Sequence, residues 1–209
     1  MSLDYEKPFH EKGIKLIVGL DEAGRGCLLG PVVASAVILP VVFYHPLIND
    51  SKKLTEKQRE KAFEIIKEHA IEYAIGECSV EEIDKMNILE ASREAMMRAL
   101  RQIKTKYELV ITDYMKLPEI KGVEVIPIAH GDALALNIAA ASIIAKVTRD
   151  HYCYELEKKY PDFKISSHKG YGTKEHLDEL DKYGPIKGLH RFSYKPIKER
   201  LIKKITIFD

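Results

Sequence analysis

Four carboxylates of the sequence follow short apolar runs, where a folded chain would hold them at strand ends. Asp21 and Glu22 come directly after the first such run. Asp113 ends a later run, and Asp132 follows the one after it. A hard cation such as Mg²⁺ requires oxygen ligands, usually one or two carboxylates together with phosphate oxygens of a substrate. If these strands are neighbours in one sheet, the four carboxylates could hold two metal ions.

Asp150 is a second candidate for the fourth carboxylate. Each acid taken alone has an ordinary explanation, because an acid after a strand often caps a turn or a helix. If one straight helix began at Asp132, Asp150 would lie about 27 Å further along it, at 1.5 Å per residue. The two could not then ligate the same ions. We favour Asp132, and expect Asp150 to orient other groups or to form ion pairs with Lys146 and Arg149.

The elements that must position these acids follow from the apolar pattern. The runs 14–20 and 32–39 are rich in Val, Ile and Ala and are bounded by Gly and Pro, which predicts buried strands. They are too close in sequence for a helical crossover and should pair antiparallel. Further strands are expected at 71–77, 109–113 and 123–128.

Helices are expected between and after these strands. Capping boxes at 55–58 and 79–82 should open two of them. The others are expected at 88–103, 138–160 and 174–183, and the second of these has alanines near its start that allow close packing. The order of strands and helices predicts an α/β domain built on a mixed sheet.

The composition fits a globular protein without a disulfide framework. The 209 residues suffice for one domain with a real core, and 33 basic residues nearly balance 32 acidic ones. Any basic surface must therefore be local. Cys27, Cys78 and Cys153 are far apart and form no CxxC pair, which favours reduced thiols and a cytoplasmic location.

Two features argue against a membrane or secretory role. The first residues lack the basic start and apolar stretch of a secretory signal. The uncharged stretch 26–44 is near spanning length, but Gly30-Pro31 and Pro40 would break a helix there. We therefore expect two short buried strands in this stretch and no contact with a membrane.

Several motifs together resemble ribonuclease HII, a type 2 ribonuclease H. In chain order they are Asp21-Glu22-Ala23-Gly24-Arg25-Gly26, Leu29-Gly30-Pro31-Val32-Val33, Asp50-Ser51-Lys52-Lys53-Leu54, Asp113, the stretch 138–150, and His168-Lys169-Gly170-Tyr171-Gly172-Thr173. The first motif is highly specific by itself. The motifs keep the family's order and cover most of the chain.

The resemblance implies a fold and a metal site. The fold would be a ribonuclease H-like mixed sheet flanked by helices at 1–160, with a small helical C-terminal part at 161–209. Asp21, Glu22, Asp113 and Asp132 would be the catalytic and metal-binding residues, with two Mg²⁺ or Mn²⁺ ions in the substrate complex. The sequence departs from the family at His130, where a Lys is usual, so the surroundings of Asp132 should differ.

The resemblance also implies a substrate and its contacts. The family hydrolyses the RNA strand of RNA/DNA hybrids and cuts 5′ of ribonucleotides embedded in duplex DNA, leaving 3′-hydroxyl and 5′-phosphate ends. Gly24, Arg25 and Gly26 match the turn that contacts the 2′-hydroxyl, the group that distinguishes RNA from DNA. Tyr171 matches the tyrosine that packs on the next sugar. The expected phosphate contacts are Ser51, Lys52, Lys53, Lys146, His168 and Lys169.

No motif of the sequence identifies a protein partner. We expect a monomer, and a sliding-clamp-type replication partner is compatible with the resemblance. The basic end of the chain could follow a nucleic-acid backbone, although a solvated helix face explains it equally well. Its residues are His190-Arg191-Phe192-Ser193, Lys195, Lys198, Arg200, Lys203 and Lys204, and the solvated helix face is the alternative for the last four.

Two other classes of function compete with this hypothesis. A P-loop nucleotide hydrolase needs the pattern GxxxxGK[ST], which is absent, and the stretch 170–174 is no substitute for it. A module that binds hybrids without cutting them would keep the basic residues. Four carboxylates beside bound phosphates would only weaken such binding without metal, which counts against it.

Overall fold

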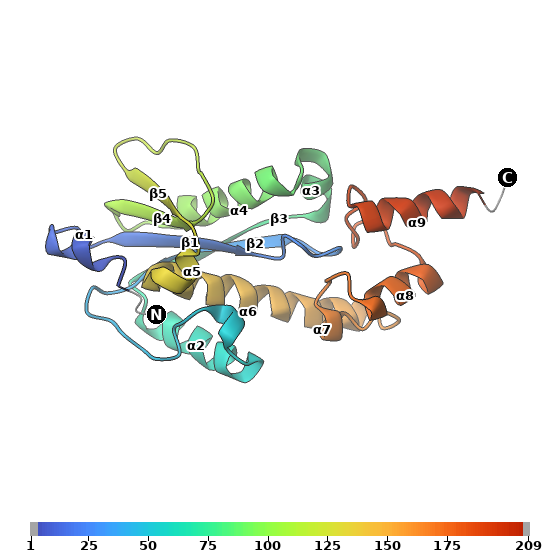
Figure 1. Ribbon diagram of the computed structural model, residues 1–209, viewed down its shortest axis with the longest axis horizontal. Coiled ribbons are helices and arrows are strands. Elements are labelled where there is room, and N and C mark those ends of the chain that lie inside the picture. Colours follow the sequence, from blue (N-terminus) through green and yellow to red (C-terminus); the bar gives the residue numbers. More distant parts are fainter. Residues whose placement is uncertain (1–3, 207–209) are drawn as a thin grey trace.

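A computed structural model describes residues 4–206 and is built around a five-stranded sheet (Figure 1). The strand order is β3-β2-β1-β4-β5. The strands are β1 (Ile17–Ala23), β2 (Val32–Ile38), β3 (Glu72–Cys78), β4 (Leu109–Asp113) and β5 (Glu124–Ile128). β2 runs antiparallel to β1 and β3, whereas β4 runs parallel to β1 and β5. The predicted mixed sheet of an α/β fold is confirmed.

β1 is longer at its end than the sequence suggested. It pairs with β2 as far as Ala23, but its pairing with β4 ends at Leu20. Asp21 and Glu22 therefore lie within the strand and not after it, which corrects the expected position. Beyond Leu20 the strand has a partner on one side only, so β1 and β4 separate there and leave open space between them.

Helices cover both faces of the sheet (Figure 1). One face carries α3 (Val80–Met86) and α4 (Ile88–Gln102), and the other carries α2 (Glu56–His69), α5 (Gly131–Leu134) and α6 (Leu136–Lys159). α1 (Lys7–Glu11) lies near the start of the chain, and a 3-10 turn, η1, spans Ser51–Lys53. Both predicted capping boxes are present, with Thr55 accepting from Gln58 and Ser79 from Glu82.

The central helix α6 packs very close to β1. A Cβ atom on Gly19 would lie only 2.2 Å from the backbone carbon of Asn137, so only glycine fits at this crossing. The buried carboxylate of Glu6 accepts hydrogen bonds from the N–H groups of Leu136 and Asn137, at 3.1 and 2.8 Å. A distant acid thus caps the helix, a role that no local pattern predicted.

The start of α6 corrects one step of the sequence argument. Asp132 belongs to the separate helix α5, and Ala135 between the two helices is extended, with φ −121° and ψ 127°. No continuous helix joins Asp132 to Asp150, so the 27 Å separation that assumed one does not apply.

The C-terminal part adds α7 (Ile165–His168), α8 (Lys174–Tyr183) and α9 (Lys195–Thr206) at one end of the sheet (Figure 1). It shares an apolar cluster with the end of α6 and with Leu28 and Leu29. A division at residue 160 stays a prediction. Residues 207–209 and the side chains of Lys203 and Lys204 lie outside the described part of the chain.

None of the described helices combines the length and the apolar composition that crossing a bilayer requires.

Candidate active site

The four carboxylates gather where β1 and β4 separate. Asp21 and Glu22 come from β1, and Asp113 is the last residue of β4. The N–H of Gly131 donates to Oδ1 of Asp113 at 2.8 Å, which ties α5 and its Asp132 to the end of β4. Asp21 and Asp132 are only 6% and 4% exposed, so both acids lie largely out of water.

The acids interact strongly through their charges. Burial raises the pKa of Asp21 well above its usual 3.8, and the charges of Glu22 and Asp113 raise it further. Burial also raises the pKa of Asp113, and the charge of Asp132 adds to this. In Glu22 burial raises the pKa while Arg25 opposes the shift. Such a group of like charges is costly without a cation.

The polar partners of the acids fit a divalent cation. Oε1 of Glu22 accepts from Arg25 at 3.2 Å, while its Oε2 is buried without a hydrogen-bond partner among residues 4–206. Oδ2 of Asp132 pairs with Nζ of Lys52 at 2.9 Å. Within the described residues no three acidic, His or Cys side chains already enclose an ion position.

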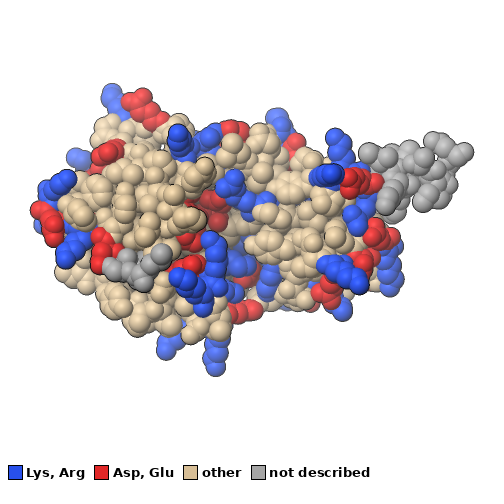
Figure 2. Space-filling model, viewed as in Figure 1, with Lys and Arg blue, Asp and Glu red and all other residues tan. Residues whose placement is uncertain are grey.

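A cavity of about 290 Å³ opens beside Asp21, Glu22 and Asp113, whereas Asp132 is not among the residues that line it. Figure 2 shows acidic side chains recessed in the hollow between the sheet and the C-terminal helices, with basic side chains around it. The cavity is lined by Asp21, Glu22, Ala23, Gly24, Arg25, Gly26, Ser51, Lys52, Arg59, Asp113, Ser142, Lys146 and Tyr171. Most of the predicted site residues are therefore brought together. A larger cavity, of about 760 Å³, lies near α1 and contains none of them.

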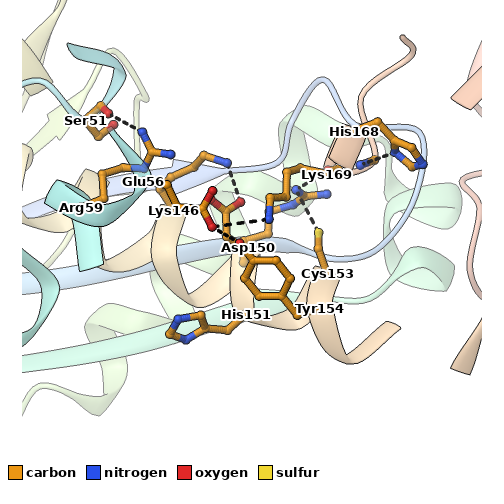
Figure 3. Close-up of polar contacts among 12 residues, drawn as sticks. Ser51, Glu56, Arg59, Lys146, Asp150, His151, Cys153, Tyr154, His168 and Lys169 are labelled. Carbon is orange, nitrogen blue, oxygen red and sulfur yellow. Dashed lines mark hydrogen bonds and ion pairs between the residues drawn. The ribbon is translucent and has the colours of Figure 1, made fainter. Parts of the chain in front are cut away.

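Sequence reasoning missed Ser142 and Arg59. Ser142 lies in the stretch 138–150 that carried the resemblance, and its Oγ is 2.9 Å from Oγ of Ser51. Arg59 donates to the carbonyl oxygens of Ser51 and Leu54, at 3.2 and 2.6 Å, and so fixes the turn that carries Lys52 (Figure 3). Nothing near Arg59 in the sequence distinguishes it from other surface arginines.

Three expected phosphate contacts lie outside the cavity. Lys53 pairs with Asp50 at 3.7 Å on the surface. The side chain of His168 is 1% exposed and faces Glu179, so no surface is left for a phosphate. Nζ of Lys169 lies 3.6 Å from the ring centre of Tyr154 (Figure 3). For His168 and Lys169 the expectation is corrected, because burial withdraws both side chains from the substrate face.

Asp150 forms an ion pair with Lys146. It is 3% exposed, and Nζ of Lys146 donates to it at 2.5 Å (Figure 3). Arg149, which we expected on the same ion-pair face, is instead buried and donates to the carbonyl oxygens of Leu29 and Lys169, at 3.1 and 2.8 Å. The ion-pair interpretation thus fits Asp150 and Lys146 but not Arg149.

The two residues that follow the Gly24–Gly26 turn are joined by backbone contacts to the tyrosine loop, defined as residues 169–173. Leu28 N–H donates to the Gly170 carbonyl at 2.7 Å, and Cys27 forms an isolated β-bridge with Tyr171. The buried guanidinium of Arg191 adds a bond to the Arg25 carbonyl at 3.1 Å. Tyr171 remains 44% exposed, facing the cavity. The two motifs therefore form one surface beside the acids.

Comparison with known proteins identifies this arrangement. The family model described as Ribonuclease HII matches residues 18–197. The chain belongs to the ribonuclease HII family. A ribonuclease HII of Acholeplasma laidlawii is 48% identical over 200 residues, which is 96% of this chain and 97% of that protein. As a family member the chain is a ribonuclease H endonuclease, which hydrolyses the RNA strand of RNA/DNA hybrids.

Two solved structures show the same fold. Ribonuclease H2 from Pyrococcus horikoshii is 26% identical with a TM-score of 0.74, covering 90% of this chain and 98% of its own. Ribonuclease HII from Archaeoglobus fulgidus, solved in a complex with PCNA, is 28% identical with a TM-score of 0.70, covering 86% and 95%. Both agree with the predicted ribonuclease H-like sheet.

We expect Asp132→Asn to slow hybrid cleavage by at least about 100-fold and Asp150→Asn by about 10-fold or less. Asp132 lies within the field of the acid cluster, whereas Asp150 is neutralised by Lys146. Single-turnover rates at saturating Mg²⁺ measure the difference. The reverse order would make Asp150 the fourth ligand. His130, which precedes α5 with φ 58°, is present in both variants, so they do not test its effect.

Proposed function

We propose that this ribonuclease HII also cuts duplex DNA on the 5′ side of a single embedded ribonucleotide, leaving 3′-hydroxyl and 5′-phosphate ends. The observation that carries the proposal is the joining of the Gly24–Gly26 turn to the tyrosine loop beside the acids. The Gly24–Gly26 turn can contact the 2′-hydroxyl, and the tyrosine loop can contact the sugar of the next nucleotide. Together they would recognise a step from RNA to DNA.

Asp21, Glu22, Asp113 and Asp132 would hold two Mg²⁺ or Mn²⁺ ions. When bound, such ions supply a reactive water and neutralise the charge of the leaving oxygen. The protein orients the acids beforehand, since Glu22 N–H donates to Asp21 at 2.7 Å and Gly131 N–H to Asp113 at 2.8 Å. These bonds fix one oxygen of each carboxylate, and the hydroxyl of Ser142 also hydrogen-bonds the carboxylate of Asp21.

Position 24 of the turn requires glycine. Gly24 has φ +95°, and a Cβ there would lie 2.1 Å from Nε of the buried Arg149. A Cβ on Gly26 would be 3.9 Å from the Tyr171 ring. At the two glycines no side chain stands between the backbone of the turn and a sugar next to that ring. Tyr171 can then lie against the following deoxyribose.

The basic residues at the cavity would position the strand without reading its sequence. Arg25 is 44% exposed and Lys52 is 77% exposed at their side chains, so both can meet a phosphate. Lys146 also lines the cavity. In this arrangement Lys52 serves two partners in turn, Asp132 before binding and a phosphate afterwards.

We further propose that the enzyme acts as a monomer in the cytoplasm and binds a sliding-clamp-type partner. The support for the partner is the complex with PCNA formed by the related Archaeoglobus fulgidus enzyme.

A duplex DNA with one central ribonucleotide tests the proposed cut. We expect a single nick on its 5′ side in Mg²⁺, and none when EDTA removes the ion. An all-DNA duplex of the same sequence is the control, and a long hybrid shows that the enzyme is active. A 3′-side cut, or no cut where the hybrid is cleaved, would contradict the proposal.

A further inference from the structure

Three buried histidines pack together beside the tyrosine loop. His168 ends α7, His176 lies in the first turn of α8, and His190 follows α8; they are 4%, 0% and 0% exposed. The rings of His168 and His176 stack with their centres 4.1 Å apart. A neutral imidazole has one donor and one acceptor nitrogen. The backbone groups around these rings therefore determine which nitrogen carries each proton.

The protons of His190 and His176 can be placed in turn. Ile186 N–H donates to Nδ1 of His190 at 3.0 Å, so the ring proton of His190 is on Nε2. That nitrogen lies 3.3 Å from Nε2 of His176, which must accept. The proton of His176 is therefore on Nδ1. It points to the carbonyl oxygen of Tyr171 at 2.9 Å and donates to it.

The surroundings keep these rings neutral. Burial lowers the pKa of His176 to about 4 and that of His190 to about 3. A proton added at Nε2 of His176 would meet the Nε2–H of His190. The stacked ring of His168 accepts Gly170 N–H at Nδ1 and donates from Nε2 to Glu179, at 2.9 and 3.1 Å. His168 thus binds the tyrosine loop at Gly170, whereas His176 binds it at Tyr171.

We propose that His176 is a positioning residue for Tyr171, held in its Nδ1–H form by His190. The inference rests on the proposed role of Tyr171 in cleavage. The loop begins at Lys169, a non-glycine residue with a positive φ of 50°, a conformation that its surroundings must hold. The Tyr171 carbonyl receives two donors, His176 and the N–H of Thr173 at 2.8 Å. These bonds fix the backbone of Tyr171, and the side chain of Tyr171 faces the cavity.

Imidazole ¹⁵N chemical shifts test the proton placement in the unmodified enzyme at neutral pH. We expect His176 to be the Nδ1–H tautomer, and His168 and His190 to be Nε2–H tautomers. A charged His176, or one with its proton on Nε2, would overturn the inference. This measurement needs no substitution and no substrate, so it does not depend on whether a variant folds.

Substitutions at 176 test the consequence for cleavage of the single-ribonucleotide duplex. An Asn side chain can place an amide N–H near the position of Nδ1–H, whereas Leu cannot donate. We expect His176→Leu to lower the single-turnover rate about 10-fold or more, and His176→Asn to recover most of it. Substrate affinity measured in Ca²⁺ should change much less than the rate. Equal rates for both variants and the parent would overturn the inference.

A double substitution separates this inference from the proposed function. In a Tyr171→Ala background, His176→Leu should cause no further loss, because the two act through one ring. If Tyr171→Ala lowers the single-turnover rate but His176→Leu cleaves at the parent rate, the inference about His176 is wrong while the proposed role of Tyr171 stands. If Tyr171→Ala cleaves at the parent rate, the proposed role of Tyr171 falls, and that of His176 with it. His69→Leu, at an exposed histidine of α2, is the control.

Discussion

Asp21→Asn is expected to lower the single-turnover rate of hybrid cleavage by at least about 1,000-fold. Removing one ligand of the proposed metal pair would take away several kcal/mol of charge stabilisation, and each 1.4 kcal/mol corresponds to about tenfold in rate. Asp113→Asn should behave in the same way. A rate near that of the parent in saturating Mg²⁺ for both variants would refute the assignment of the metal site.

The same substitution should leave the metal-free protein at least as stable as the parent. Because the folded state raises the pKa of Asp21, it holds the proton more tightly than the unfolded chain, so the ionised acid costs stability at neutral pH. A neutral Asn removes that cost, and the melting temperature should rise by about 2–4 °C for each kcal/mol gained. Mg²⁺ should raise the melting temperature of the parent but not of the variant.

Thermal unfolding with and without Mg²⁺ gives both results in one experiment. Asp162→Asn, at an exposed acid far from the cluster in sequence, is the matched control and should change neither rate nor melting temperature. If Asp21→Asn unfolds at a lower temperature than the parent, the acid stabilises the fold, and the loss of activity would then have a structural cause.

Tyr171→Ala should lower the rate on a single-ribonucleotide duplex by about 100-fold. The ring lies beside the glycine turn, and misplacing a reacting group by about 1 Å can cost that much. Tyr171→Phe should retain most of the rate, because the proposed contact uses the ring face and not the hydroxyl. Rates and Ca²⁺ affinities for both substrates measure the effect. Tyr44→Ala, at a tyrosine 75% exposed in another part of the surface, is the control.

The sequence predicted the sheet and its acids well because their signals are local. Most strands are short apolar runs, β3 alternates polar and apolar residues, and Asp113 does end β4 as expected. The end of β1 was misplaced because Asp21 and Glu22 are polar, and polarity normally marks a strand end. Their pairing with Ser35 and Ala34 of β2 overrides that signal. Burial beside β2, which no local pattern shows, keeps them in the strand.

The missed parts of the site depend on contacts between distant segments. Arg149 and Arg191 resemble surface arginines in the sequence, yet both are buried and donate to carbonyl oxygens around the turn. Glu6 caps a helix 130 residues away. Lys169 was placed among the phosphate contacts because its neighbours match a motif. Only the fold shows that its ammonium group lies over Tyr154.

Backbone hydrogen bonds connect the segment after the Gly24–Gly26 turn to the C-terminal part, so the two are not independent modules. Leu28 and Gly30 donate to the carbonyls of Gly170 and Leu189, and Arg191 N–H donates back to Leu28, at 2.7, 2.9 and 2.9 Å. A chain cut after α6 would leave these buried groups without partners and expose the apolar cluster around them. We therefore expect the acids and the tyrosine loop to unfold as one cooperative unit, so that deleting the end of the chain would impair both.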